Sequence, residues 1–363
     1  MADFTDQFTY GVRKIQATLE AKKPSVSFLR NRYFSGLLES ENENVSVEVR
    51  RRGTVLLPSI RRTDSAINVG AVAPHTISTY TPPYFFYEAT GTIGEANKRV
   101  FGEPVEAPYS KAERMVAIMG EKIDLGIRES LIMNEEAQCS QIIKTGKVTP
   151  KAMAHDGTLY AAAEINFGVD SDLVGGPVAS LWTTSSDILK SLRDYCLLVF
   201  GKTGKLPTEM IVGKKVLETL LGNAKFIAAL DNRRIEGNQM RSQAFAGYPG
   251  VAYNGTINVP MVGDLSILSY VNGYAYNGDA SETEMIDYNG LLLTSPGWGT
   301  MGYAGLYDKV SGMPGMVAGK TLLHAIEGDV RNHFAYSAYV QSAPLAMPTQ
   351  LDAWFYKTVV AAD

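Results

Sequence analysis

The stretch "YVQSAPLAMPTQLDAWFYKTVV" (residues 339–360) lies almost at the end of the chain and decides the fold. Terminal residues usually fray unless something holds them, yet apolar and aromatic residues alternate here nearly to the last position. This alternation predicts half-buried strands that pack on another element. Pro344 and Pro348 predict a bend or an edge strand, because proline cannot donate a hydrogen bond to a neighbouring strand.

The clearest single element is a long helix in the first half of the chain. Ser110 and Glu113 form an S-x-x-E capping box, and Gly146 supplies a left-handed stop. We predict one helix over residues 110–144, about 35 residues and about 50 Å long at the α-helical rise. Apolar residues recur on more than one side, which indicates broad contact. Two glycines inside the helix predict a bend or a close backbone approach there, Gly120 and Gly126.

Residues 45–92 are rich in β-branched and aromatic residues and are interrupted by Pro and Gly, which predicts a long β-hairpin. A two-stranded ribbon is only marginally stable alone in water, so we expect it to lie against another surface. The candidate subunit-contact residues on it are Arg50, Arg51, Arg52, Val55, Leu56, Leu57, Arg61 and Arg62. One interpretation is a solvated ribbon, since strand alternation places Arg51 opposite Arg50 and Arg52. The other pairs these arginines with carboxylates of a neighbouring subunit, either on the long helix or at Glu39, Glu41 and Glu43.

A second region begins near residue 185, where helix and strand patterns alternate. The stretch "SSDILKSLRDYCLLVFG" predicts an amphipathic helix capped by Ser186 or its neighbours, "TEMIVG" a strand, and "KKVLETLL" and "AKFIAALDNRR" two helices. The region closes with β-rich sequence in which Asn272-Gly273 predicts a hairpin turn. We therefore expect an α/β unit with a β-rich end.

The sequence carries no motif that predicts catalysis, a cofactor or a metal. The segment "FGKTGKLP" (residues 200–207) resembles the end of a phosphate-binding loop, but position 196 is Cys196 where that loop needs glycine. A helix end followed by a turn is the better interpretation. The four histidines lack zinc-site spacing, and the two cysteines lie in apolar helical patterns typical of buried thiols. Catalysis by a pair of carboxylates stays an open alternative, because any fold can bring two carboxylates together.

Composition restricts the class of protein further. Hydrophobic residues make up 45% of the chain and charged residues 20%, with no apolar run long enough to cross a bilayer. The first residues, "MADFTDQFTY", lack the features of a secretory signal. The formal net charge of −4 argues against a dedicated DNA-coating protein, although weak local contact with DNA stays open.

Several stretches, taken in order, resemble the major capsid proteins of tailed bacteriophages, in particular the lambda-type branch and the phage major capsid protein E family. They are "SFLRNRYF" (27–34), "TISTYTPPYFFYEATGTIGEANKRVFGEP" (76–104), "GGPVASLW" (175–182), "VGDLSILSYVNGYAYNG" (262–278) and above all the terminal stretch quoted first. The resemblance runs from about residue 27 to residue 360. No single motif is specific, and the order of the motifs carries the resemblance.

This resemblance implies an α+β class and the Hong Kong 97-like capsid fold, with a long spine helix. It implies an N-terminal arm (1–44), an extended β-hairpin loop (45–95), a peripheral domain (96–184 and 328–363, with the spine helix at 110–144) and an axial domain (185–327). It also implies that the terminal strands return to the peripheral sheet and pack on the spine helix. Loop cross-linking through lysine is not expected, because residues 45–92 contain no Lys.

The implied function is that of a structural shell subunit, not an enzyme, which assembles as pentamers and hexamers into the icosahedral head that encloses phage DNA. The implied partners are copies of itself, a separate scaffolding protein, a portal, a decoration protein, and packaged DNA through weak non-specific contact. The implied location is the virion, after assembly in the host cytoplasm and without a membrane. Two alternatives stay open: an encapsulin-type compartment that encloses an enzyme, and an α/β enzyme, which would need a deep pocket with convergent polar groups.

Overall fold

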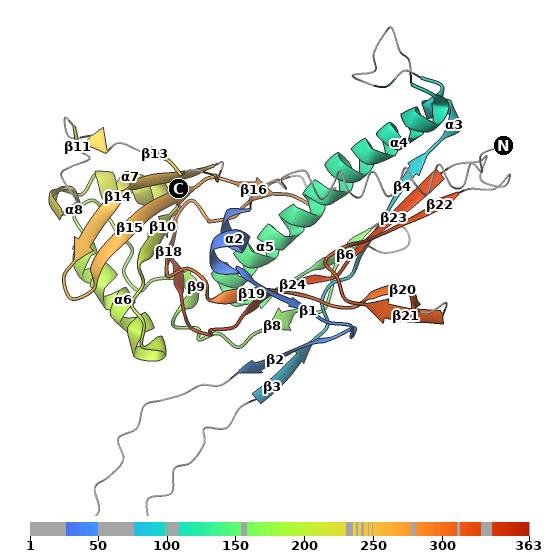
Figure 1. The fold of residues 1–363 in the computed structure, drawn as a ribbon. Helices are drawn as coiled ribbons and strands as arrows, with labels where there is room; N and C mark the ends of the chain where they lie inside the picture. The colour runs from blue at the N-terminus through green and yellow to red at the C-terminus, as the bar shows by residue number, and fades with distance from the viewer. Residues whose placement is uncertain are drawn as a thin grey trace, which may run out of the picture.

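The structure, a computed structural model, describes residues 27–49, 76–98, 100, 109–153, 158–229, 235–236, 239–240, 243–245, 247–248, 250–276, 281–310, 313–327 and 336–362. A long helix runs diagonally through the molecule, with a large sheet and shorter helices at one end and a three-stranded sheet at the other (Figure 1). A two-stranded ribbon leaves the body between them. No described helix is both long and apolar enough to cross a membrane.

The long helix is continuous but changes its winding in the middle. It consists of α4 (Lys111–Glu121), the π-helical segment η1 (Lys122–Arg128) and α5 (Glu129–Thr145). The predicted capping box is confirmed: the Ser110 hydroxyl accepts the Glu113 N–H and the Glu113 carboxylate accepts the Ser110 N–H. Gly146 ends the helix in the left-handed conformation, with φ 72°, as predicted. The π segment contains Gly126, whereas Gly120 lies in α4, and the bend or close backbone approach predicted at these glycines stays a prediction.

A three-stranded antiparallel sheet covers the first half of this helix. Its strand order is β22–β23–β4, with β4 at Phe85–Gly91, β22 at Leu322–Glu327 and β23 at Tyr336–Ser342. Ala89, Ala338 and Val340 from the sheet form one hydrophobic cluster with Met115 and Met119 from α4. The short helix α3 (Ile93–Ala96), which has its own Thr92–Glu95 capping box, leads from β4 towards α4.

The terminal stretch joins three different sheets. β23 lies in the sheet just described, β24 (Pro344–Pro348) pairs with β19 (Gly299–Tyr303), and β25 (Phe355–Thr358) pairs with β18 (Gly290–Thr294). β24 is an edge strand, as its prolines predicted, because β1 (Gly36–Glu39) occupies the other side of β19. The predicted packing on the spine helix is confirmed, since the Trp354 indole donates to the Ile143 carbonyl at 3.0 Å. The prediction that the whole tail returns to the sheet beside that helix is wrong for β24 and β25.

The large sheet has seven strands in the order β13–β14–β15–β10–β18–β25–β9. Its remaining strands are β9 (Val174–Pro177), β10 (Glu209–Val212), β13 (Gln243–Ala244), β14 (Val251–Val259) and β15 (Gly263–Tyr270). The accompanying helices are α6 (Ile188–Thr203), α7 (Lys214–Leu221) and α8 (Ala224–Ala229), close to the predicted positions. The residue that caps α6 is Asp187, the neighbour of Ser186.

The hairpin predicted at Asn272-Gly273 is wrong. β15 ends at Tyr270 and pairs with β14 and β10, whereas β16 (Gly273–Tyr274) pairs with the distant β17 (Thr283–Glu284). The Asn272 amide donates to the Tyr270 hydroxyl and its carbonyl oxygen accepts the Gly273 N–H. Asparagine therefore stabilises a local turn through its side chain and does not reverse a strand pair.

Smaller strand pairs complete the described part of the chain. The ribbon pairs β2 (Val45–Val49) with β3 (Thr76–Tyr80). Further pairs are β5 (Lys147–Val148) with β8 (Ile165–Asn166), β6 (Lys151–Met153) with β7 (Leu159–Ala161), β11 (Ile235–Glu236) with β12 (Gln239–Met240), and β20 (Leu306–Val310) with β21 (Met313–Val317).

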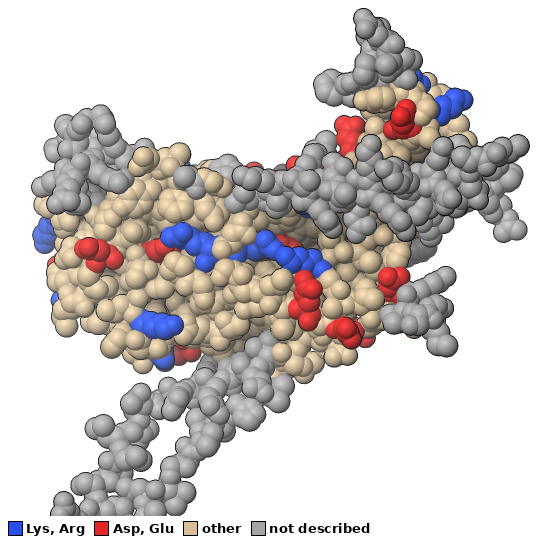
Figure 2. Space-filling view, in the orientation of Figure 1, with Lys and Arg blue, Asp and Glu red and all other residues tan. Residues whose placement is uncertain are grey.

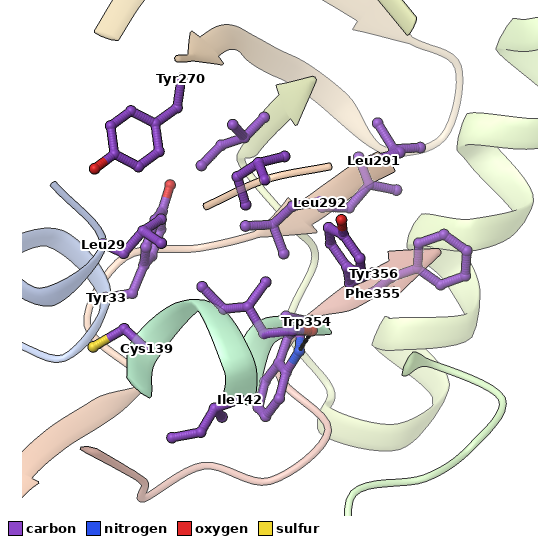
Figure 3. Packing of buried hydrophobic residues seen from close by; sticks show 14 of the residues in the cluster. Leu29, Tyr33, Cys139, Ile142, Tyr270, Leu291, Leu292, Trp354, Phe355 and Tyr356 are labelled. Carbon is purple, nitrogen blue, oxygen red and sulfur yellow. Dashed lines mark hydrogen bonds between the residues drawn. The ribbon is translucent and has the colours of Figure 1, made fainter. Parts of the chain in front are cut away.

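The larger hydrophobic core joins the second half of the helix to the seven-stranded sheet. Figure 3 shows Ile142 of α5 beside Trp354 from the terminal stretch, with Leu29 and Tyr33 entering the same core from α2 (Phe28–Tyr33). Both cysteines are free and buried in this core, as predicted. The spine helix is thus shared by two cores, and each sheet is built against a different half of it.

Candidate subunit interface

The ribbon of β2 and β3 projects away from the body (Figure 1). Its strands are antiparallel, in register from Val45 opposite Tyr80 to Val49 opposite Thr76, so the predicted hairpin is confirmed at its base. The predicted extent to residue 92 is wrong, because Phe85–Gly91 form β4 and pair with β23 in the three-stranded sheet. The base is anchored because Val45 is buried in the larger core and Tyr80 packs on Phe167 at 5.0 Å between ring centroids. The predicted contact residues Arg50–Arg52, Val55–Leu57, Arg61 and Arg62 lie outside the described residues.

The three predicted acidic contact residues lie beside this base. Glu39 is the last residue of β1, Glu41 and Glu43 follow in the connection to β2, and all three are exposed. The connection is held by two backbone hydrogen bonds, from Ser40 N–H to the Tyr303 carbonyl and from Gly305 N–H to the Asn42 carbonyl. No described Lys or Arg forms an ion pair with these carboxylates. They are therefore fixed in place and available at the surface.

The segment before β1 is bound deep in the molecule. We call residues 27–34 the arm segment; it contains α2 and the predicted "SFLRNRYF" motif. Phe28, Leu29, Tyr33 and Phe34 are at most 1% exposed. Phe28 meets Tyr248 edge-on with ring centroids 5.4 Å apart and Tyr270 of β15 at a tilt at 5.2 Å. Phe34 meets Trp298 at 4.7 Å. A six-residue helix is far too short to be stable alone, so this packing is what holds it.

Three buried carboxylates, which we call the arm clamp, bind the polar groups of the arm segment: Glu135, Glu136 and Glu209. Glu136 accepts the backbone N–H groups of Leu29 at 2.8 Å and of Arg30 at 2.9 Å, together with the Tyr270 hydroxyl at 2.8 Å. These donors include free N–H groups at the start of α2, which no residue of the helix itself can satisfy. One side chain of the spine helix thus caps the arm helix.

The other two carboxylates bind the arginines of the arm segment. The Arg30 Nε lies 2.7 Å from Glu135, which also accepts the Tyr303 hydroxyl at 2.6 Å. Arg32 holds Glu209 with two nitrogens of its guanidinium group, and the Tyr33 hydroxyl donates to the same carboxylate at 2.8 Å. Because Glu209 lies on β10 and the other two lie on α5, the arm segment connects the spine helix to the large sheet.

Burial determines the protonation behaviour of the clamp. It raises the pKa of Glu135 and of Glu136, while Arg30 and the donors to each carboxylate oppose that rise. Burial, together with the neighbouring carboxylate, also raises the pKa values of Tyr33, Tyr270 and Tyr303. The three hydroxyl groups therefore stay protonated at neutral pH and serve as hydrogen-bond donors.

Four aromatic residues lie at the surface on and beside the three-stranded sheet, and we call them the aromatic ladder: Tyr84 just before β4, Phe86 on β4, Tyr339 on β23 and Tyr307 on β20. Tyr84, Phe86 and Tyr307 are exposed, and Tyr339 is half-buried. Phe86 stacks on Tyr84 with ring centroids 6.4 Å apart and on Tyr339 at 5.4 Å, and Tyr84 meets Tyr307 edge-on at 5.8 Å. Phe86 and Tyr307 are 53% and 51% exposed, so the ladder is a surface feature and not part of either core. Large exposed apolar patches of this kind mark interaction sites.

Sequence reasoning missed the arm clamp and the aromatic ladder. One feature of the sequence indicates the clamp. Glu135 and Glu136 are adjacent in the apolar second half of a helix, where buried carboxylates need partners. The signal for the ladder is four consecutive aromatic residues in "YFFYEAT" (84–90), because successive side chains of a strand point to opposite faces and one face of this strand then carries aromatic residues away from the helix.

One sequence motif and the surface charges remain to be placed. Gly204 ends α6 in the left-handed conformation, which confirms that "FGKTGKLP" is a helix end and a turn. The described residues contain no cluster of His, Cys, Asp and Glu that could hold a metal ion. Figure 2 shows Lys and Arg in a row across the middle of one face, with Asp and Glu along its borders.

Comparisons with known proteins identify the family. A sequence profile of the phage major capsid protein E family matches residues 11–359. No curated protein sequence matches the chain significantly.

Solved structures are similar to this chain at low sequence identity. The putative capsid protein of a prophage of E. coli CFT073 is similar with a TM-score of 0.65 and 14% identity, over 96% of this chain and 98% of that chain. A phage-related protein of Bordetella bronchiseptica RB50 gives 0.48 and 12%, over 96% and 98%. The mature capsid of bacteriophage PhiM1 gives 0.49 and 12%, over 94% and 90%.

The profile covers nearly the whole chain, and the structural match to the prophage protein covers both chains almost fully. The α+β, Hong Kong 97-like capsid fold that the sequence resemblance implied is thereby confirmed. The chain belongs to the phage major capsid protein E family.

Proposed function

We propose that copies of this chain join through the ribbon that β2 and β3 begin, residues 45–80, into pentamers and hexamers, which close into an icosahedral head around phage DNA. Family membership makes the chain a structural subunit of the virion shell. The observation that supports the ribbon as the connector is its geometry: its base is anchored in the core, and its strands leave the body. A ribbon that lacks a third strand or a covering helix gains stability by lying on another subunit.

Within this proposal, the arginines of the ribbon pair with Glu39, Glu41 and Glu43 of a neighbouring copy. The three carboxylates are exposed and held on a fixed connection. Arginine binds carboxylates through two parallel hydrogen bonds, which gives direction as well as attraction. Such pairs would fix the register between copies, while the apolar Val55–Leu57 would exclude water from the contact.

Charge reversal tests the pairing. The Arg50→Glu, Arg51→Glu, Arg52→Glu triple variant should lose particles in electron micrographs, and Lys at positions 39, 41 and 43 in the same chain should restore them. A matched control is Arg193→Glu, since Arg193 is a surface arginine of α6 that forms an ion pair with the adjacent Asp194. Normal particles from the triple variant would remove the pairing, whereas a wild-type chain that forms no particles even together with its scaffolding partner would remove the proposed assembly into a head.

The chain acts through assembly and not through catalysis, and we propose four further partners: a separate scaffolding protein, a portal, a decoration protein, and DNA held by weak contact at the inner wall. We also keep the division into arm (1–44), extended loop (45–95), peripheral domain (96–184 and 328–363) and axial domain (185–327) as a proposal. Purified particles that contain nuclease-protected DNA support the phage head. A cargo enzyme in their place would favour the compartment alternative.

A further inference from the structure

β4 forms an edge of the three-stranded sheet and carries none of the sequence features that protect an edge strand. Within the described part of the chain, β23 is the only strand that pairs with β4. Natural proteins protect such edges with lysine, proline, bulges or very short strands. β4 has seven residues without lysine or proline, and its register with β23 is continuous. A strand of this kind can pair with an extended segment of another molecule.

The face of β4 that points away from the spine helix combines an aromatic ring with a carboxylate. Phe86 and Glu88 are both exposed and lie on this face, because side chains two positions apart in a strand point the same way. The Tyr339 hydroxyl donates to Glu88 at 3.0 Å, and the Tyr339 ring stacks on Phe86 with centroids 5.4 Å apart. The carboxylate is therefore held in place beside the aromatic ladder.

The cation that such a surface attracts is missing from the described residues. No Lys or Arg among them forms an ion pair with Glu88. Lys122 contacts β4 at the Thr90 carbonyl, at 2.7 Å, but its ammonium group is also bound by the Glu95 carboxylate at 2.9 Å. A guanidinium group is planar, stacks on aromatic rings and binds a carboxylate through two parallel hydrogen bonds, which an ammonium group cannot do. The surface therefore suits arginine better than lysine.

We propose that β4 is the docking edge for an extended, arginine-bearing segment of a separate protein. The segment adds to the sheet as a fourth strand, and one of its arginines lies on Phe86 and pairs with Glu88. Backbone pairing supplies affinity, and the arginine supplies specificity. A second copy docked through the same edge would instead bring two Glu88 carboxylates to one face without a cation between them, which charge complementarity disfavours. The inference goes beyond the proposed function, because it does not use the ribbon of β2 and β3.

A short peptide tests the edge on the unassembled chain. The probe is a fluorescently labelled Thr-Val-Thr-Arg-Thr-Val-Thr peptide, in which the arginine and both valines share one face of a strand. Fluorescence anisotropy should show binding that weakens at least about threefold when lysine replaces the arginine. Citrulline keeps the planar shape without the charge and should weaken binding about tenfold. N-methylation of one alternate set of peptide amides should abolish binding, while methylation of the other set should not, because only one set faces β4.

Variants of the chain locate the bound probe. Glu88→Gln should weaken binding of the arginine probe about tenfold and remove the preference for arginine over citrulline. Phe86→Ala should weaken the binding of both probes. The matched controls are Glu218→Gln, at an exposed glutamate of α7, and Tyr160→Ala, at a tyrosine of β7 that is 54% exposed. Both controls should bind like the wild type, and melting curves confirm that each variant is folded at the temperature of the titration.

Three results would overturn the inference: an arginine probe that binds no tighter than the citrulline probe, an equal effect of Glu88→Gln and Glu218→Gln, or binding that neither set of N-methyl groups disturbs. Occupation of the edge by a second copy would also overturn it, and would appear as a loss of probe binding when the chain is concentrated into oligomers or particles. The titration of the unassembled chain does not require particles to form, so its failure is distinguishable from failure of the proposed function.

Discussion

Replacing Glu136 by Gln removes the charge from the centre of the arm clamp without changing its shape. One Glu136 oxygen accepts Leu29 N–H and the Tyr270 hydroxyl, and the other accepts Arg30 N–H. In Glu136→Gln an amide N–H₂ group takes the place of one of these oxygens. Whichever way the amide turns, at least one donor of the arm segment or Tyr270 then faces another donor.

The expected cost follows from these three contacts. A buried donor without an acceptor costs about 1–3 kcal/mol, and the hydrogen bonds that remain lose about 1 kcal/mol together when the acceptor becomes neutral. Part of this loss of free energy is offset, because the neutral amide avoids the desolvation of a charge. The same desolvation raises the pKa of Glu136 in the wild-type chain. We expect a net loss of about 2 kcal/mol in the docking free energy of the arm segment.

Hydrogen exchange of the unassembled chain measures this loss locally. A change of about 2 kcal/mol corresponds to about thirtyfold faster exchange in peptides that cover residues 27–34, provided that the arm segment opens separately from the body. Glu129→Gln is the matched control, since Glu129 lies on the same helix and is exposed. Its exchange should equal that of the wild type. Unchanged protection of the arm segment in Glu136→Gln would refute the clamp.

Three further outcomes are expected. Gly146→Ala should destabilise the chain by about 2 kcal/mol in thermal unfolding, because φ is 72° there and the new Cβ would lie 2.8 Å from the Val169 Cβ; a loss below about 0.5 kcal/mol would contradict this. Phe86→Ala should change stability by about 1 kcal/mol or less but lower the particle yield if the aromatic ladder contacts another subunit, and an unchanged yield would leave it a surface feature. Cys139 and Cys196 should resist iodoacetamide at pH 8 until the chain unfolds, because burial raises the pKa of Cys196 to about 12 and that of Cys139 well above its usual value; rapid labelling of the native chain would contradict the packing.

The elements that the sequence predicted well are those set by local chemistry. The capping box at Ser110, the left-handed stop at Gly146 and the edge position of Pro344 each follow from backbone hydrogen bonding within a few residues. The pairing partners of the tail were not local. β25 lies beside β18, which is more than sixty positions earlier in the chain. The alternation of apolar and polar residues indicates that a strand is half-buried, but it does not indicate which sheet the strand joins.

The hairpin signal at Asn272-Gly273 failed for a related reason. An Asn-Gly pair favours positive φ, which serves a two-residue hairpin only if both flanking segments are strands that can pair with each other. Here β15 was already paired on both sides, with β14 and with β10, so its continuation had no free edge to return to. Tertiary pairing thus overrode the local preference for a turn.

The arm clamp explains how a six-residue helix can position a ribbon. The arm segment is fixed to α5 through Glu135 and Glu136 and to β10 through Glu209, so it cannot move without breaking contacts with both parts of the molecule. β1 follows directly and pairs with β19, and the exposed acidic connection then leads into β2. Each step from the clamp to the ribbon is therefore held by paired backbone or buried charge. A connector between copies needs such a base, because a ribbon on a mobile base would lose orientational entropy on every contact that it formed.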